Sequence, residues 1–315
     1  MTRRKFVYSF VGTSAIAAAY PCYFEPRWLV VTRPRVDLKR APLAGPVRIL
    51  QLSDLHLSWC VPLSLIDSAI SLGLNQKPDL ICLTGDFITG LEDLSTGAYA
   101  RALSRLSMAA PTFAVLGNHD GGIWARAMGG YSDHGAVEKL LEQSGIHLLH
   151  NASRRVQIQN AGLTLVGLGD LWADEIEPER AFSGLDAELP VVLLSHNPDS
   201  KDTLATYPWD LMLSGHTHGG QVIVPFDGPR FAPVQDKRYV AGLGAWGSRQ
   251  IHVSCGVGNL GGVRFRCRPE VSLSTLGPSP SFPVTTRQHS LTPTKTTLST
   301  RARTSSSGSP MLSSN

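Results

Sequence analysis

The 315-residue sequence contains only five cysteines, and their arrangement excludes the protein classes that depend on cysteine. Their number is odd, no two form a CxxC pair and no zinc-finger spacing occurs, so neither a disulfide framework nor a structural zinc site is predicted. Cys82 lies inside an apolar run, which is typical of a core residue. We therefore interpret the cysteines as small, buried apolar side chains. They are Cys22, Cys60, Cys82, Cys255 and Cys267.

Basic residues are scarce in the middle of the chain, although the whole sequence has a net charge of +4. Residues 1–40 hold eight Lys/Arg and two acidic residues, and residues 277–315 hold four Lys/Arg and no acidic residue. The two flanks together carry +10, which leaves −6 for the middle. A protein that binds nucleic acid concentrates positive charge on its folded domain, because phosphate contacts dominate that affinity. We therefore expect no nucleic-acid partner.

Long apolar runs are missing as well, even near the N-terminus. The stretch 7–20 is only mildly apolar and is shorter than the roughly 20 apolar residues of a membrane-spanning helix. It follows the paired-arginine sequence Thr2-Arg3-Arg4-Lys5-Phe6, which is the layout of a secretory signal. We predict that residues 1–40 are an export signal or a membrane-associated segment, and that the protein lies in the bacterial cell envelope, periplasmic or membrane-associated.

Two other interpretations of the N-terminus stay open. One is a frayed amphipathic helix without a signal function. The other is an uncleaved anchor that makes peripheral membrane contact through the apolar stretch 28–31 and the basic side chains around it. These basic side chains are Arg27, Arg33 and Arg35. A cytoplasmic location is the less favoured alternative.

Large apolar residues are almost absent from Gly277 onward, where serine, threonine and proline dominate. A segment of this composition cannot bury enough apolar surface to offset the entropy lost on ordering it. We predict a disordered tail over residues 277–315 without a catalytic role. Residues 41–276 remain for one catalytic domain, a length that allows a large core.

The middle of the chain contains short apolar, β-rich runs that predict buried strands. Helix-like segments at 63–74 and 98–108 separate the first three runs, so the first half is predicted to form successive β-α-β units. The second half has shorter elements and many glycines, and it is predicted to be richer in strands. The predicted strands are 47–52, 80–83, 112–116, 163–166, 191–194 and 211–213.

Polar clusters follow five of these strands at the point where each strand ends. Because open α/β sheets bind ligands at the carboxyl ends of their strands, we expect the five loops to meet in one cleft. Each cluster alone has an ordinary explanation as a turn or a structural histidine, but half of the ten histidines of the chain lie in them. The clusters are Asp54-Leu55-His56, Gly85-Asp86, Gly117-Asn118-His119-Asp120, His196 and Gly215-His216-Thr217-His218.

Carboxylate, imidazole and amide ligands without thiolate are typical of sites for manganese, iron or zinc. Two such ions, held about 3.5–4 Å apart by a shared carboxylate, lower the pKa of a bridging water and contact both oxygens of an in-line displacement at phosphorus. We predict two divalent metal ions per chain, with manganese favoured and iron or zinc as alternatives. Phosphoryl transfer fits this ligand set better than peptide hydrolysis does.

The same ordered motifs resemble the signature of the calcineurin-like metallophosphoesterase superfamily across roughly residues 47–276. Further stretches, and the paired-arginine N-terminus, are similar to the bacterial YaeI-type phosphodiesterases. The resemblance implies an α/β fold, a four-layer α/β-β/α sandwich with two mixed sheets. It also implies a phosphodiesterase that acts on small-molecule or lipid-linked phosphate esters. The further stretches are 61–66, 196–201, 215–221 and 236–242.

The resemblance also implies a role for each site residue. Asp86 would bridge the two metal ions, and a hydroxide activated by both ions would attack the phosphorus. His119 would not bind metal, but would protonate the leaving oxygen or stabilise its charge. Asp120 would orient the His119 ring and keep it protonated near neutral pH. The remaining ligands would be Asp54, His56 and His218 for one ion, and Asn118, His196 and His216 for the other.

Departures from related families narrow the predicted substrate. The residues after Asp86 lack the Asp-Arg-Gly of the Ser/Thr protein phosphatases and the tyrosine of the purple acid phosphatases, and the His119 motif ends in Asp rather than Glu. These departures argue against phosphoprotein substrates and a coloured iron centre. Two alternatives stay open: a pyrophosphatase for a lipid-linked nucleotide of the UDP-diacylglucosamine type, and a non-catalytic metal-binding interaction module.

The stretch Asp236-Lys237-Arg238-Tyr239 has two interpretations. It is either a basic and aromatic rim that contacts the substrate phosphate or leaving group, or a surface turn held by ion pairs. The surface turn is slightly favoured.

Overall fold

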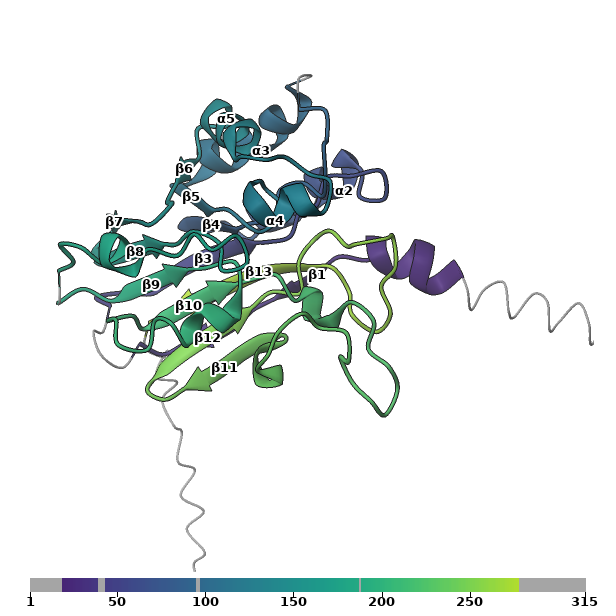
Figure 1. The fold of residues 1–315 in the computed structure, drawn as a ribbon. Coiled ribbons are helices and arrows are strands. Elements are labelled where there is room, and N and C mark those ends of the chain that lie inside the picture. Colours follow the sequence, from purple (N-terminus) through teal and green to yellow (C-terminus); the bar gives the residue numbers. More distant parts are fainter. Residues whose placement is uncertain (1–18, 39–42, 95–96, 187, 278–315) are drawn as a thin grey trace, which may run out of the picture. The chain divides into compact units, whose positions relative to one another are not determined.

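Two β-sheets form the centre of the fold, and each of them mixes parallel and antiparallel strands (Figure 1). The structure is a computed structural model that describes residues 19–38, 43–94, 97–186 and 188–277. All of these residues belong to the unit Met1–Ser279. The paired-arginine start and residues 278–315 of the predicted tail lie outside the described residues.

The first sheet has the strand order β1-β13-β3-β4-β5-β6, with β2 also pairing with β13. Strands β3 to β6 run parallel, whereas β13 is antiparallel to β3. The bounds are β1 (Val30–Thr32), β2 (Arg35–Val36), β3 (Val47–Leu52), β4 (Leu80–Thr84), β5 (Thr112–Val115), β6 (His147–Leu148) and β13 (Glu270–Leu276).

The second sheet has the order β11-β12-β10-β9-β8-β7. Its four inner strands are parallel, and both edge strands, β7 and β11, are antiparallel to their neighbours. The bounds are β7 (Ala152–Ile158), β8 (Ala161–Gly167), β9 (Val191–Leu194), β10 (Leu211–Ser214), β11 (Gly242–Trp246) and β12 (Arg249–Val253).

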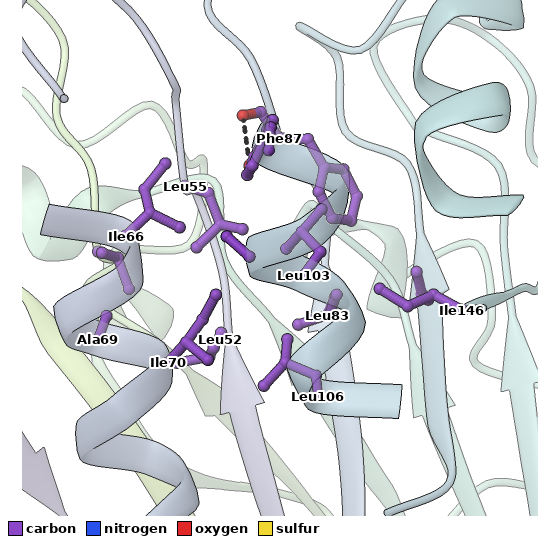
Figure 2. Close-up of a cluster of buried hydrophobic side chains, with 14 of the residues drawn as sticks. Leu52, Leu55, Ile66, Ala69, Ile70, Leu83, Phe87, Leu103, Leu106 and Ile146 are labelled. Atoms are coloured by element: carbon purple, nitrogen blue, oxygen red, sulfur yellow. Dashed lines mark hydrogen bonds between the residues drawn. The ribbon is translucent and has the colours of Figure 1, made fainter. Parts of the chain in front are cut away.

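Helices cover the outer face of the first sheet. In α2 (Leu63–Leu74) the buried apolar residues recur every three or four positions, which gives this helix one apolar face. That face packs with α3 (Ala98–Ala109) and α5 (Gly135–Gln143) over the strands. Figure 2 shows apolar side chains of this cluster gathered between the helices and the sheet, among them Ile70 and Leu106.

Apolar side chains of both sheets form a second core between them. The strands β4 and β9 are buried on both faces, which explains why they are uninterrupted apolar runs in the sequence. The outer face of the second sheet is covered by shorter elements: α6 (Pro178–Ala181), η3 (Pro198–Lys201) and η5 (Lys237–Tyr239). The predicted α/β fold with two mixed sheets in a four-layer arrangement is confirmed, as are all six predicted strands and both predicted helices.

The folded unit also includes residues that the sequence analysis had separated from the catalytic domain. Residues 19–38 contain η1 (Tyr20–Phe24), η2 (Glu25–Arg27) and the strands β1 and β2, both of which pair with β13. The folded part therefore begins before residue 41, because β13 returns from the other end of the domain and offers an edge for pairing. Among the described residues, no helix is both long and apolar enough to cross a membrane. The predicted export or membrane role of residues 1–40 stays a prediction.

Candidate metal centre

The five polar clusters meet where the strands end. Two of them leave β3 and β4 of the first sheet, a third follows β5, and the last two leave β9 and β10 of the second sheet. The seven predicted metal ligands are all less than 5% exposed. Burying this many carboxylate and imidazole groups is costly unless they are paired with charge or bound to a cation. The ligands are Asp54, His56, Asp86, Asn118, His196, His216 and His218.

One group of donors, which we call the first half-site, consists of Asp54, His56, Asp86 and His218. One ligand atom from each of these four residues lies within 4.8 Å of the others. The Nε2 atoms of His56 and His218 are 3.1 Å apart, and His218 Nε2 is 3.5 Å from Asp54 Oδ1. These residues come from three different loops, so the half-site exists only in the folded chain.

The second half-site consists of Asn118, His196 and His216 together with the shared Asp86. Asp86 Oδ2 lies 3.2 Å from His56 Nε2 and 3.2 Å from His196 Nε2, so one oxygen faces both half-sites. His196 Nε2 is also 3.3 Å from His216 Nδ1. This position suits a bridging carboxylate, as the sequence predicted for Asp86.

The backbone around the half-sites is held in an uncommon conformation. Five of the seven predicted ligands have a positive φ, between 46° and 69°. A left-handed backbone is disfavoured for residues with a side chain, and it persists at functional sites where the surrounding structure holds it. Position 117 requires glycine, because a β-carbon there would lie 2.3 Å from Asp86 Oδ1. The five ligands are Asp54, His56, Asp86, His216 and His218.

Several ligand atoms are buried without a hydrogen-bond partner. Such atoms are rare, and each costs about 1–3 kcal/mol when nothing satisfies it. Each of these atoms is an oxygen or nitrogen of a type that can act as a ligand of a divalent metal ion. The residues present therefore fit divalent metal ions. The atoms are Asp54 Oδ2, Asn118 Oδ1, His216 Nε2 and His218 Nδ1.

The protonation of the site also fits metal binding. Burial lowers the pKa of His216 to about 3 and holds the pKa of His218 well below its ordinary value, so both rings are neutral, as metal ligands must be. Burial alone would raise the pKa of Asp86, but the surrounding imidazoles, His196 first, outweigh it and hold that pKa well below the usual range. Asp86 is therefore an anion between the imidazoles of His56 and His196.

His119 lines the same cleft but makes different contacts. Its Nδ1 donates to the Thr89 carbonyl oxygen over 2.9 Å, which leaves Nε2 as the ring nitrogen available to a substrate. Burial lowers the pKa of His119 despite the attraction of Asp86. His119 lies in the cleft, and its predicted cationic state at neutral pH, which burial opposes, stays a prediction.

The predicted role of Asp120 is wrong. Its carboxylate accepts the backbone N–H groups of Asp86 and Gly117, both over 2.8 Å, and that of Phe87 over 2.7 Å. Asp120 therefore ties the loop after β4 to the loop after β5 and does not reach the His119 ring. Neighbouring residues in this turn point in different directions, and a backbone carbonyl from another loop holds the ring instead.

Sequence reasoning missed the walls of the cleft, which has a volume of about 410 Å³. The ring of Trp124 lies 4.6 Å from that of His119, and the ring of Trp172 lies 4.2 Å from that of His216. The two tryptophan rings are 5.7 Å apart. Neither tryptophan belongs to a polar cluster or follows a strand directly, so no pattern in the sequence marks them.

Residues 236–238 form a turn at the surface, whereas Tyr239 is buried. Arg238 Nη2 lies 2.7 Å from Asp236 Oδ2, and Asp236 also accepts the Arg238 backbone N–H. Neither residue lines the cleft. The favoured interpretation as an ion-paired turn agrees with these contacts.

The fold and the buried carboxylate–imidazole cluster define a metal-dependent hydrolase. The family model for calcineurin-like phosphoesterases matches residues 47–220, a range that contains every predicted ligand. The chain belongs to this family and is a metallophosphoesterase.

Three relatives extend the match over most of the chain. It is 46% identical over 278 residues to a phosphodiesterase of Escherichia coli, YaeI, covering 88% of this chain and 99% of the relative. It is 30% identical to an uncharacterized metallophosphoesterase of Bacillus subtilis, YkuE, covering 88% of this chain and 98% of the relative. It is 29% identical to a UDP-2,3-diacylglucosamine pyrophosphatase of Chlamydia muridarum, LpxG, covering 85% of this chain and 97% of the relative.

Proposed function

We propose that this chain is a phosphodiesterase that binds two divalent metal ions, preferably manganese, and acts in the bacterial cell envelope. The observation that carries the proposal is the position of Asp86 Oδ2, which faces donors of both half-sites at 3.2 Å. The 46% identity to a relative described as a phosphodiesterase supports the choice of a diester. When bound, the two ions would supply an activated water and stabilise the charge that develops on the phosphate.

The protein's own groups have separate tasks in this reaction. His119 is positioned to act on the leaving oxygen, because its Nδ1 donates to Thr89 and its Nε2 is available to the substrate. The backbone N–H of His119 also donates to Asp86 Oδ1 over 3.0 Å, so the shared carboxylate and the proposed acid are held at a constant spacing. Asp120 contributes indirectly, since it joins the two loops that carry these residues.

The cleft walls favour an ester with an apolar or aromatic group. Trp124 and Trp172 stand beside His119 and His216, and Phe231 and Leu260 also line the cleft. Phe231 and Leu260 are 69% and 39% exposed, which places apolar side chains at the boundary between the cleft and solvent. A lipid-linked nucleotide is therefore a second candidate substrate, and the relative described as a UDP-2,3-diacylglucosamine pyrophosphatase supports it.

One panel of assays tests the reaction class. The purified full chain is given an aryl phosphodiester, an aryl phosphomonoester and a UDP-linked diacylated glucosamine, each with and without a chelator. We expect the diester to be hydrolysed fastest and all activity to stop with the chelator. Preferred release of UMP from the lipid nucleotide would replace the diesterase with the second candidate. Metal binding without hydrolysis of any ester would favour an interaction module.

Metal content and location are tested separately. Elemental analysis of protein purified without added metal should give two ions per chain with manganese in excess, and excess zinc or iron would contradict the metal preference.

Fractionation of a bacterium that expresses the full chain should place the protein in the periplasm or membrane. A variant with both Arg3 and Arg4 replaced by Lys is the matched control, because it keeps the charge but removes the paired arginine. Equal amounts of the unaltered protein in the cytoplasm would contradict the proposed location.

A further inference from the structure

Two cysteines, Cys255 and Cys267, lie together behind the first half-site. Their sulfur atoms are 2.6 and 2.7 Å from the point where a β-carbon would stand at Gly219. Gly219 has a φ of +62°, so its backbone geometry and the two sulfurs both favour glycine there. Both sulfurs therefore occupy one small space against the backbone that follows His218.

This pair is connected directly to ligands of the first half-site. Cys267 Sγ donates to the backbone oxygen of His218 over 3.1 Å. On the other side, the segment that begins at Cys255 runs along the Asp54 loop: the Val257 N–H donates to Ser53 O over 3.0 Å, and the Gly258 N–H donates to Asp54 O over 2.6 Å. A covalent link between the two cysteines would join the supports of two ligands.

A buried arginine already holds the two cysteines near each other. Arg264 is 0% exposed, and its guanidinium donates to the Cys255 carbonyl over 2.7 Å and to the Cys267 carbonyl over 3.2 Å. The Cys267 N–H donates to Glu25, and the Cys255 N–H donates to Glu270 over 2.7 Å. The backbone of both residues is thus fixed before any bond forms, which lowers the conformational entropy that bond formation has to overcome.

The other three cysteines are not part of this pair. Cys82 is buried in the core between the sheets, Cys22 is exposed, and Cys60 is half-buried with its sulfur near the Ser58 hydroxyl and Asn259. The expectation that all five cysteines are buried is therefore wrong for Cys22, Cys60 and Cys255. It treated each cysteine separately, whereas Cys255 and Cys267 become a pair only in the folded chain.

We propose that Cys255 and Cys267 are a disulfide-forming pair that clamps the wall behind the first half-site. The bond forms by exchange with a small-molecule disulfide such as oxidised glutathione. One cysteine thiolate attacks that disulfide and releases one thiol, and the second cysteine thiolate then displaces the other. The protein loses two hydrogens and gains one S–S bond, while the oxidant loses its S–S bond and becomes two thiols.

The bond has a structural consequence for the metal centre. It would hold segment 255–267, which contacts the Asp54 loop, against the backbone that carries His218. Restricting this wall leaves fewer arrangements in which the donors of the first half-site separate, so the oxidised protein should release metal more slowly. The proposed pairing itself does not depend on the proposed function, because it is read from the mass of the linked peptides.

The pairing is tested on the folded, full-length protein. Reduced protein is incubated with oxidised glutathione, quenched with acid, unfolded, alkylated and digested for mass spectrometry. We expect a peptide pair linked through Cys255 and Cys267, and glutathione attached to the exposed Cys22 as an internal positive control. Alkylation of both Cys255 and Cys267, or glutathione on each of them, would overturn the proposed pair.

The clamp is tested by metal release. Metal-loaded protein, reduced or oxidised, is mixed with excess chelator, and the loss of metal is followed by a colorimetric indicator. We expect release to be at least about 3-fold slower after oxidation, and this difference to vanish in Cys255→Ser and Cys267→Ser. Cys22→Ser, at the exposed Cys22, is the matched control and should keep the difference. Equal release rates of the oxidised and reduced wild type, with the disulfide confirmed by mass, would overturn the clamp.

Discussion

The two half-sites of the metal centre differ in how their donors are assembled. The first has four donor atoms within 4.8 Å and two carboxylates, Asp54 and Asp86. The second shares Asp86, and its other donors are the neutral amide of Asn118 and the imidazoles of His196 and His216. These two rings approach each other to 3.3 Å between His196 Nε2 and His216 Nδ1. The first half-site therefore carries one more negative charge. Because a divalent cation is held largely by charge, the first of the two proposed ions should bind more tightly than the second.

This difference suggests that the first half-site has the more structural role and the second half-site the more chemical role. The first half-site is supported on its far side by Gly258, Arg264 and the cysteine pair, whereas the second stands beside Trp172. An ion held by fewer charges exchanges more readily with solvent and substrate. The predictions below test this comparison, beginning with the residue that the two half-sites share.

Replacing Asp86 by Asn should have the largest effect, because it removes the one carboxylate that both half-sites use. We expect activity to fall by about 10⁴-fold or more and metal content to drop in both half-sites, measured by steady-state rates and elemental analysis. Asp236→Asn, which removes a carboxylate from the surface turn, is the matched control and should behave as wild type. Two retained ions in Asp86→Asn would show that Asp86 is not shared.

Replacing His119 by Ala should separate chemistry from metal binding. We expect a rate loss of about 10²- to 10⁴-fold with the metal content of both half-sites unchanged. The loss should also depend on pH. Burial lowers the pKa of His119, so the ring is protonated only at lower pH, and the advantage of wild type over the variant should shrink as pH rises through that pKa. Full activity of the variant would exclude His119 from the reaction, and His147→Ala, an exposed histidine, is the control.

Stepwise removal of metal tests the comparison directly. A chelator titration should release the ion of the second half-site first. Asn118→Asp adds the missing negative charge, and we expect it to tighten the weaker site by about 10-fold and to bring the two release steps together. Asn118→Ala should leave one ion per chain. Simultaneous release of both ions from the wild type would contradict the proposed difference in affinity.

Replacing Trp172 by Ala should affect substrate binding beside the second half-site more than it affects chemistry. We expect KM for an aryl phosphodiester to rise about 10-fold, with kcat changed by no more than about 3-fold, because the ring contacts His216 but supplies no ligand. Trp59→Ala is the matched control, since that side chain is 87% exposed. A large fall in kcat with an unchanged KM would instead place Trp172 in the support of the metal centre.

The smallest expected effect concerns the support of the Trp172 loop. His134 Nε2 lies 2.8 Å from Glu175 Oε1, and although burial lowers the pKa of His134, the hydrogen bond and charge of Glu175 raise it overall. A raised pKa stabilises the fold below the ordinary histidine pKa of about 6.5, and this stability is lost as pH rises through the raised value.

The measurement for this pair is the free energy of unfolding, obtained from denaturant titrations at several pH values. Between pH 6 and pH 9 we expect the wild type to lose up to about 1 kcal/mol relative to Glu175→Gln. The same pH dependence in both proteins would show that the pair contributes nothing. His150→Gln is the control, because the His150 ring lies 5.8 Å from that of His134. This variant should keep most of the pH dependence of the free energy of unfolding.

Much of the fold was predictable because its signals are local. The buried strands β4 and β9 are continuous apolar runs, and the apolar spacing in α2 needs no knowledge of its partners. The ligand types were predictable for a similar reason, since each cluster directly follows a strand. That these clusters converge follows from a general property of parallel strands, whose carboxyl ends lie at one edge of a sheet.

Other features depend on residues far apart in the chain. Asp120 was assigned to the wrong partner because adjacency in sequence does not decide which way a side chain points in a turn. The N-terminal boundary was misplaced because the pairing of β1 with β13 joins residues from opposite ends of the domain. Trp172 was missed because its place beside His216 results from the second sheet's packing and not from any motif.

The sequence by itself determined the fold class, the family and the chemical nature of the candidate metal ligands, because apolar periodicity and donor type are properties of short segments. Only the tertiary structure decided which oxygen faces both half-sites, what holds the His119 ring and which cysteines form a pair. Those features are distances between atoms of separate loops, and such distances exist only after the two sheets have packed together.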